Sequence, residues 1–500
     1  MHTLKSKLID AMDGNATCDA LYVNKQVISY TQLYNISCYV ADLLSQYTCQ
    51  NKQAVAILSH REIAAYASVI GCVFAGKTYV PLNVKAPIER LVSMLVTAKI
   101  NTMLVSEKYQ HLAHGIKVLL PDVEIIVLEE SFLLQESENE LTCADNLDKS
   151  TNSTCYIMFT SGSTGKPKGV PISNDNLLAY LNYVVPFCGL SCEDRASQTF
   201  DLTFDLSVHD LFVTWLSGAC LYALPESALF SPGNFIKKHQ LTAWFSVPST
   251  GAIMQKFGML KENVYPSLRL SLFCGEALPT NTALAWQKSA PNSKVINFYG
   301  PTEATIACGY FEVPVGYDDQ QVIPIGKPFE HISFSISPDK ELFIAGAQVT
   351  SGYLEATPAM NESFEQTLNN NGKLVTWYHS GDKVEKNDEG NFIYKGRLDD
   401  QVKIQGYRVE LLEVEVIAKE FLKNNLVKVL VWPHDISSFN NALYLCVQAD
   451  KNEEIEQATV KYMKSRLPHY MQPKKIIWLE SMPLNLNGKI DSNALRAILE

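Results

Sequence analysis

Residues 155–169 read CYIMFTSGSTGKPKG, an apolar run that breaks directly into glycines, hydroxyl residues and lysines. The run has the composition of a buried strand, and the small residues after it allow the backbone to wrap closely around an anion. Hydroxyl and backbone N–H groups can donate to the oxygens of that anion, and Lys166 and Lys168 add positive charge. A triphosphate fits this chemistry.

The spacing within this segment disfavours two other interpretations. Lys166 follows Gly165 directly and precedes a proline, so the segment departs from the GxxxxGK[ST] pattern of an ordinary P-loop. A flexible Gly/Ser linker is disfavoured as well, because such a linker rarely follows a buried strand directly or carries two lysines in a tight turn. The segment therefore indicates a nucleotide-binding chemistry other than that of P-loop NTPases.

Helical patterns alternate with short β-rich runs on the N-terminal side of this segment. Runs at 54–58, 102–105 and 124–127 predict a layered α/β fold with a parallel sheet. A polar stretch over 136–153 predicts a surface connection. Further α/β units follow, and the sequence then becomes rich in strands up to residue 398.

The last part of the chain predicts a separate small unit. Its expected elements are a helix over 411–423, strands at 427–431 and 443–447, and a charged helix over 453–466. We therefore expect an α/β protein with two parts. A large N-terminal domain over 1–398 contains layered α/β subdomains plus a β-rich segment, and a small mobile C-terminal α+β domain covers 399–500.

Composition excludes several classes of protein. Lysine and arginine total 42 against 53 acidic residues, a net charge of −11 that disfavours a nucleic-acid partner. The N-terminus lacks the apolar core of a secretory signal, and the apolar stretch at 64–76 is too short to span a bilayer. Twelve cysteines are scattered without CxxC pairs, as expected of free thiols. A cytoplasmic protein without membrane insertion is expected.

Three further motifs carry chemistry. The string NFYGPTEAT at 297–305 combines aromatic residues, a turn and a carboxylate, which could line adenine, bend the backbone and hold Mg²⁺ through Glu303. Asp382 ends YHSGD, where one carboxylate after a glycine turn could accept both ribose hydroxyls, although an isolated aspartate in a turn is more often a cap. Near the end, PLNLNGKID places Lys489 on a turn.

Together with YIMFTSGSTGKPKGV at 156–170, these strings resemble the motifs of the adenylate-forming superfamily, which includes acyl-CoA ligases, luciferases and the adenylation domains of peptide synthetases. The resemblance covers about residues 20 to 495, with the motifs in the family's order. It implies ATP and Mg²⁺ as cofactors, with Lys489, Thr164 and Glu303 as catalytic residues and Glu303 as the metal ligand. A cation such as Lys489 would lower the barrier to attack of a carboxylate on the α-phosphate.

The resemblance also implies the nucleotide site and the hinge. GRLDDQVKIQGYRVEL at 396–411 resembles the start of the family's C-terminal domain, with Asp399 as the pivot. Gln405 replaces an arginine that is common in peptide synthetases. The implied ATP-binding residues are Thr160, Ser161, Gly162, Ser163, Thr164, Gly165, Lys168, Gly275, Glu276, Ala277, Asn297, Phe298, Tyr299, Gly300, Pro301, Thr302, Asp382, Tyr394, Arg397 and Lys489.

The string FDLSVHD at 204–210 indicates the substrate class. In amino-acid adenylating members an aspartate here pairs with the substrate's ammonium group, and Asp205 occupies that place; the alternative is a helix-capping aspartate. Local strings are similar to those of ligases that load D-alanine onto a carrier protein, which implies a small side chain. The implied substrate pocket is Asp205, Leu206, His209, Ser246, Leu272, Cys274, Phe298, Ile306, Ala307 and Lys489.

The substrate itself stays open. His209 replaces an expected apolar residue, Phe298 is bulkier than expected, and the lead-in at 198–203 is similar to proline-activating enzymes. His209 is equally compatible with a core histidine. D-alanine, L-proline and L-serine all fit, and chirality is undetermined.

The expected acceptor is a separate phosphopantetheinylated carrier protein, because the chain ends at Glu500 without a carrier module. One alternative is an acyl-CoA ligase acting on a small carboxylic acid, which Asp205 disfavours. Another is a non-catalytic adenylate-binding regulator, which the intact Thr164, Lys168, Glu303, Asp382 and Lys489 disfavour.

Overall fold

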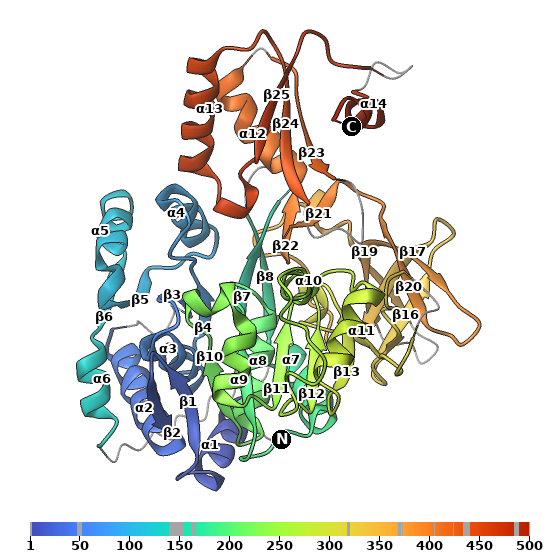
Figure 1. Cartoon of the computed structure of the whole chain (residues 1–500). Helices are drawn as coiled ribbons and strands as arrows, with labels where there is room; N and C mark the ends of the chain where they lie inside the picture. Colours follow the sequence, from blue (N-terminus) through green and yellow to red (C-terminus); the bar gives the residue numbers. More distant parts are fainter. Residues whose placement is uncertain are drawn as a thin grey trace.

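The computed structural model describes residues 3–47, 53–139, 154–162, 167–317, 321–368, 372, 374–404, 406–423, 425–433, 441–484 and 490–499. Within these ranges the chain forms a large α/β body, a β-rich segment beside it and a small C-terminal domain above it (Figure 1). Four of the sequence-based expectations, the layered α/β part, its parallel sheet, the β-rich segment and the small α+β domain, are confirmed. None of the described helices is both long and apolar enough to cross a membrane.

The apolar run at 155–159 is the greater part of strand β7 in a six-stranded sheet of the described chain, with the order β6-β5-β3-β4-β7-β8. Its strands are β3 (Ala54–Leu58), β4 (Thr78–Pro81), β5 (Thr102–Ser106), β6 (Glu124–Leu128), β7 (Thr154–Thr160) and β8 (Lys168–Ser173). All neighbours run parallel except β7 and β8. The glycine-rich segment therefore joins two antiparallel strands.

The helices of this part form from apolar faces or from entirely apolar sequence. Helix α3 (Ile63–Phe74) is buried along its whole length, which explains why its sequence is almost entirely apolar. The others that the structure describes here are α1 (Leu4–Gly14), α2 (Tyr30–Tyr47), α4 (Ile88–Thr97), α5 (Gln110–Leu119) and α6 (Glu130–Glu136).

A second, nine-stranded sheet in the described chain has the order β15-β14-β13-β12-β11-β9-β10-β1-β2. Its strands are β1 (Asp19–Val23), β2 (Gln26–Ser29), β9 (Arg195–Gln198), β10 (Cys220–Ala223), β11 (Ala243–Ser246), β12 (Leu270–Phe273), β13 (Lys294–Tyr299), β14 (Gly309–Glu312) and β15 (Lys327–Pro328). Its helices are α7 (Asn174–Cys188), α8 (Leu206–Leu216), α9 (Pro232–His239), α10 (Pro248–Lys256) and α11 (Thr280–Ser289). Strands β9 to β13 are parallel, so the loops that follow them leave the same edge of the sheet.

The β-rich segment packs beside this sheet. Its strands are β16 (Ile332–Ile336), β17 (Glu341–Gly346), β18 (Phe364–Leu368), β19 (Leu374–Lys386) and β20 (Phe392–Arg397). All neighbouring pairs are antiparallel, and β20 pairs with the last part of β19. This places Asp382 of β19 opposite Arg397 of β20.

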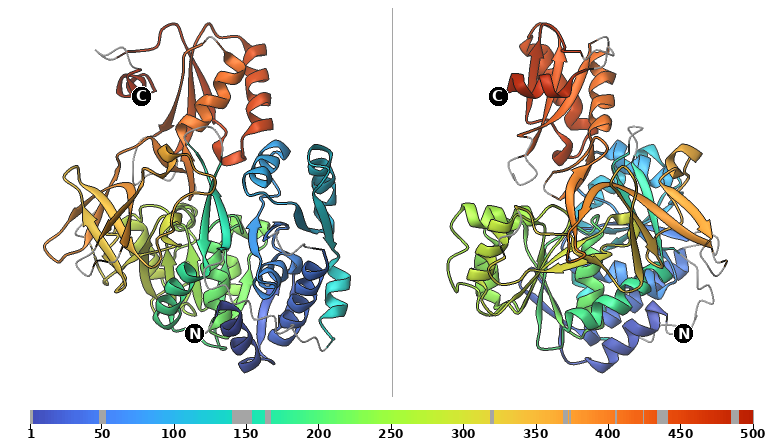
Figure 2. Two further views of the ribbon diagram at one scale, coloured as in Figure 1. Left: turned by 180° about the vertical axis from the view of Figure 1, so that it is seen from behind. Right: turned by 90° about the vertical axis from the view of Figure 1, so that its right-hand side faces the viewer.

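The C-terminal domain has a hydrophobic cluster of its own, running from Ile404 to Ile476. Its elements are β21 (Gln401–Ile404), β22 (Tyr407–Glu410), α12 (Leu411–Leu422), β23 (Val427–Trp432), β24 (Ala442–Gln448), α13 (Glu453–Arg466), β25 (Lys475–Leu479) and α14 (Ser492–Leu499). In both views of Figure 2 this domain stands above the large body, and Figure 1 labels the β21–β22 pair at the junction. That pair is the part of the domain that reaches the functional site.

Candidate functional site

The site forms where loops leave the carboxyl edge of the nine-stranded sheet beside the end of β7. The loop after β9 leads to Asp205, the loop after β12 contains Gly275, and the loop after β13 contains Gly300. Because parallel strands end at one edge, the sequence brings these distant motifs together without any local contact between them. Two cavities lie here, and they share Gly275, Gly300, Arg397 and Lys403 in their linings.

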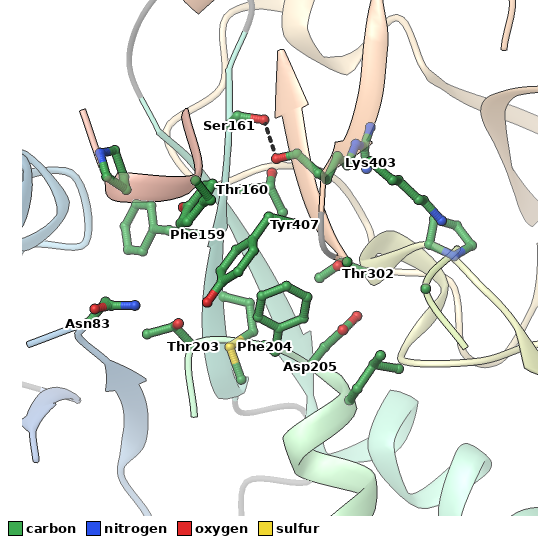
Figure 3. A pocket seen from close by; sticks show the side chains of 18 of the residues that line it. Asn83, Phe159, Thr160, Ser161, Thr203, Phe204, Asp205, Thr302, Lys403 and Tyr407 are labelled. Atoms are coloured by element: carbon green, nitrogen blue, oxygen red, sulfur yellow. Dashed lines mark hydrogen bonds between the residues drawn. The ribbon is translucent and has the colours of Figure 1, made fainter. Parts of the chain in front are cut away.

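The first cavity is lined by Thr160, Ser161, Asp205, Leu206, Gly275, Gly300, Pro301 and Thr302 of the large body. The C-terminal domain closes it from above with Lys403, Tyr407 and Arg408. In Figure 3 the side chains of Asp205, Thr302 and Phe204 surround one opening, with Tyr407 reaching toward them. The ring of Tyr407 lies 4.5 Å from Phe204 and stacks on Tyr470 at 3.7 Å.

Asp382, the predicted ribose residue, lines the first cavity, whereas the second cavity is lined by several of the other predicted ATP-binding residues. Its lining includes Gly275, Glu276, Ala277, Asn297, Phe298, Tyr299, Gly300, Tyr394, Arg397 and Asp399. Asp382 accepts a 2.5 Å hydrogen bond from the Tyr299 hydroxyl and pairs with Nη1 of Arg397 at 2.6 Å. Arg397 also forms a two-bond pair with Asp399, through Nε at 2.6 Å and Nη2 at 2.7 Å. The predicted ribose and hinge residues therefore form one network.

Asp205 immediately precedes helix α8, where its own backbone lies in the αR region and its side chain makes no N-capping hydrogen bond. The backbone N–H of Leu206, the first residue of the helix, nevertheless interacts with the carboxylate and lowers its pKa, so the helix N-terminus contributes to its environment. The pKa of Asp205 is raised to about 6, chiefly by burial and also by the nearby negative charge of Glu303, while a hydrogen bond with the Thr302 side chain opposes the rise. A carboxylate in this environment is stabilised when a cation binds beside it.

Most of the other predicted substrate-pocket residues are buried and are absent from the described lining of the cavity that contains Asp205. Ser246 ends β11, Leu272 lies in β12, and Cys274 follows that strand; all three are buried. Ile306 and Ala307 lie in a tight loop after β13, in which Ile306 has a φ of 72°, a region that β-branched residues rarely adopt.

Gln348 holds this strained loop in place. Its Nε2 donates to the backbone carbonyls of Ala304, Thr305 and Ala307 at 3.0, 3.2 and 2.7 Å. Its own backbone carbonyl accepts a 2.6 Å hydrogen bond from the Thr305 hydroxyl. The side chain of Gln348 is fully buried. The strain is thus maintained by one side chain from the adjacent β-rich segment.

Glu303, the predicted metal ligand, is fully buried and already pairs with a cation. Nη1 of Arg408 lies 2.9 Å from each of its carboxylate oxygens, and the Tyr353 hydroxyl donates to Oε1 at 2.7 Å. Burial alone would raise the pKa of Glu303, but Arg408 and Tyr353 outweigh it and hold the pKa below its ordinary value. An ionised carboxylate that requires a positive partner fits Mg²⁺.

A second contact joins the C-terminal domain to the start of the glycine-rich segment after β7. Glu413 of α12 is buried, pairs with Arg90 of α4, and accepts a 3.2 Å hydrogen bond from the backbone N–H of Gly162. The Ser161 hydroxyl donates to the Arg408 carbonyl at 2.8 Å and accepts from the Glu410 N–H at 3.0 Å. The Glu413 carboxylate thus accepts a hydrogen bond from the Gly162 N–H, a donor that the sequence-based prediction assigns to a phosphate of ATP.

Several predicted residues lie outside this set of contacts or outside the described chain. Lys168 begins β8, with Nζ 5.4 Å from the centre of the Tyr353 ring. Ser163, Thr164, Gly165 and Lys489 fall outside the described residues. Gly162 and Ile490, which border these segments, are described.

Sequence reasoning misses Arg90, Glu413 and Tyr353, and it assigns no role to Lys403 or Arg408 within the quoted hinge motif. Arg90 and Glu413 are 323 residues apart, so no local pattern links them. The two glutamates at the start of α12, Glu413 and Glu415, are the one available signal, because both are buried, which is unusual for acidic residues of a helix.

The comparisons with known proteins agree with this geometry. The family model described as AMP-binding enzyme matches residues 11–354. The chain is 30% identical over 470 residues to a D-alanine–D-alanyl carrier protein ligase of Staphylococcus haemolyticus, covering 93% of this chain and 92% of that protein. It is also similar to the Vibrio cholerae adenylation domain AlmE, solved in complex with glycyl-adenosine-5'-phosphate, with 30% identity, a TM-score of 0.87, and coverage of 99% and 97%. For IdnL7 the identity is 26% and the TM-score 0.70, over 100% of this chain and 99% of that one.

Proposed function

Because this chain belongs to the AMP-binding enzyme family, we propose that it activates a small amino acid with ATP and transfers it to a separate carrier protein. In the first step the carboxylate of the amino acid attacks the α-phosphorus of ATP, and pyrophosphate leaves. In the second step a phosphopantetheine thiol of the carrier attacks the carbonyl carbon of the aminoacyl-AMP, and AMP leaves.

The observation that carries this proposal is the position of Asp205. It is a buried carboxylate in the wall of one cavity, and the shared residues Gly275 and Gly300 connect that cavity to the one lined by Tyr299 and Arg397. An amino acid held by its ammonium group at Asp205 therefore directs its carboxylate toward a nucleotide in the second cavity. A fatty or aryl acid has no cation to stabilise Asp205.

The scheme assigns roles to the residues predicted to bind the phosphates, the adenine and the ribose. Thr160, Ser161 and the glycine-rich turn after them bind the phosphates, Asn297 to Tyr299 line adenine, and Asp382 with Arg397 binds the ribose. Glu303 would hold Mg²⁺, which neutralises charge on the phosphates when bound. Lys489 would stand between the carboxylate and the α-phosphate in the first step.

The pose of the C-terminal domain supports a division of labour between the two steps. In this pose Arg408 pairs with Glu303, and Glu413 accepts a hydrogen bond from the Gly162 N–H. The domain thus occupies the carboxylate that Mg²⁺ would need and a backbone donor that a phosphate of ATP would need. We therefore assign this pose to the second step and a rotated pose, with Lys489 inward, to the first. The boundary lies between 398 and 399, and Asp399 is the pivot.

The small pocket supports a small substrate. D-alanine, L-proline and L-serine are the leading candidates on the sequence, and the names of the relatives add weight to the smallest amino acids. The decisive experiment is amino-acid-dependent ATP–pyrophosphate exchange, measured with a panel of L- and D-amino acids and with short fatty and aryl acids. Exchange driven by a small amino acid is expected. Exchange driven only by acids without an amino group would contradict the role of Asp205 and favour an acyl-CoA ligase.

A further inference from the structure

The cavity that contains Asp205 stops one helical turn beyond it. His209 follows Asp205 by four residues in α8, so both side chains lie on the same face of that helix. In the described part of the chain the cavity lining includes Asp205 and Leu206 but not His209 or Cys274, which are only 5% and 1% exposed. The space directly beyond Asp205 along this face of α8 is therefore filled by protein.

His209 is held in a packed aromatic wall. Its ring lies 4.7 Å from Phe245 in an edge-to-face arrangement and 6.1 Å from Phe298. Behind it, the hydroxyl of Tyr180 in α7 lies 2.6 Å from Nδ1 of the imidazole. This contact fixes the ring, because a buried imidazole that turned away would lose its partner and leave the Tyr180 hydroxyl unsatisfied.

The wall is also electrically neutral. Burial lowers the pKa of His209 to about 3 and raises that of Tyr180 well above its ordinary value, so neither group is charged near neutral pH. A neutral imidazole leaves the carboxylate of Asp205 available for the ammonium group of a substrate. His209 therefore acts through its volume and its fixed position.

We propose that the amino acid activated by this chain is glycine, and that the Tyr180–His209 pair excludes larger side chains from the pocket. This inference rests on the amino acid activation proposed above and specifies its substrate. The glycyl adenylate bound by AlmE, the related adenylation domain, is consistent with a pocket of this size. His209 forms the barrier, and Tyr180 is a positioning residue that acts through it.

The expected discrimination follows from the size of one methyl group. A pocket that lacks space for a methylene or methyl typically discriminates by about 10–200-fold in kcat/KM. The full-length protein should therefore support ATP–pyrophosphate exchange with glycine at a kcat/KM at least about 10-fold above that for D-alanine, L-alanine, L-serine or L-proline.

Two variants test the pair directly. His209→Ala creates space beside Asp205, and it should bring the glycine to D-alanine ratio close to one or below it. Tyr180→Phe keeps the ring but removes the hydroxyl that fixes His209, and it should lower the same ratio by a smaller factor. Tyr265→Phe is the matched control, because Tyr265 is an equally buried tyrosine whose hydroxyl donates to the Met259 carbonyl in another hydrophobic cluster. Its ratio should equal that of the wild type.

A binding measurement covers the case in which His209→Ala fails to fold. The wild-type protein is titrated with non-hydrolysable glycyl and D-alanyl sulfamoyl-adenosine, and the glycyl compound should bind at least about 10-fold more tightly. Preferred exchange with D-alanine, L-serine or L-proline would overturn the glycine assignment and leave amino acid activation intact. Exchange with none of the amino acids would overturn both proposals, and selectivity unchanged in folded His209→Ala would overturn the role of the pair.

Discussion

Nη1 of Arg408 lies 2.9 Å from both carboxylate oxygens of Glu303, so a side chain of the C-terminal domain neutralises the carboxylate that we assign to Mg²⁺. The guanidinium and the metal ion cannot share this buried carboxylate. The pair therefore favours one pose of the domain whenever the metal and the phosphates are absent.

Replacing Arg408 with methionine should impair the second step selectively. The change leaves Glu303 buried without a cation in this pose, and loss of one partner of a buried pair costs about 3–5 kcal/mol. We expect thioester formation on the carrier to fall by about 100-fold while pyrophosphate exchange changes less than about 3-fold. Arg466→Met is the control, because Arg466 pairs with Glu420 on the exposed surface of the same domain. Equal loss of both steps in Arg408→Met would contradict the assignment.

Arg90 and Glu413 should behave as one unit in the second step. Arg90→Met and Glu413→Gln each break the contact between α4 and α12, so the double variant should lose little more activity than the worse single variant. A coupling free energy of about 1–3 kcal/mol is expected from the four rates of thioester formation. Additive losses would mean that the pair does not stabilise this pose.

Substrate binding should weaken in acid because Asp205 must be ionised to hold an ammonium group. Its pKa of about 6 in the unliganded pocket means that it is charged above this pH and increasingly protonated below it. The kcat/KM for the amino acid should thus fall about tenfold for each pH unit below 6. Asp205→Asn should lower kcat/KM at neutral pH and remove this acidic limb. A limb that persists in Asp205→Asn would belong to another group, such as Glu276, whose pKa is also raised by burial.

Lys489→Ala should impair the first step and spare the second, which is the opposite of the effect expected for Arg408→Met. Removal of one group that stabilises transition-state charge commonly costs about 10²–10³ in rate. Pyrophosphate exchange should fall by that factor, while ATP still binds and thioester formation from supplied aminoacyl-AMP continues. If exchange is unchanged, Lys489 is not the catalytic cation.

Asp399→Pro should restrict rotation of the C-terminal domain. Proline fixes φ near −65°, so a pivot that must change its backbone angles cannot do so freely. Exchange should be retained and thioester transfer impaired. Asp399→Ala is the matched control, since it also loses the ion pair with Arg397 but keeps a flexible backbone. A defect of the same size in both variants would assign the effect to the ion pair.

Much of the fold follows from local sequence patterns. The apolar run at 155–159 lies within β7, and the charged pattern over 453–466 coincides with helix α13. Asp205 and Thr302 meet because parallel strands bring their loops to one edge. In these cases the hydrophobic periodicity and the order of the strands are enough to predict the elements and which loops meet.

Contacts between distant segments could not be predicted in this way. Arg408 and Glu303 are 105 residues apart, and their meeting depends on the orientation of a whole domain. Tyr180 lies on the buried face of α7, where any aromatic residue would satisfy the helical pattern. Its role becomes visible only when its hydroxyl is seen beside His209.

The contact between Arg90 and Glu413 also limits how such proteins can recombine. A crossover at residue 398 would join a large body and a C-terminal domain of different ancestry, and the body would then retain a buried arginine selected for a carboxylate on the other side. Recombinants would work best when both parents have this pair. The short connecting segment suggests that the two parts could be exchanged there without cost. Their compatibility depends, however, on Arg90 of α4, which is 323 residues before its partner Glu413 in α12.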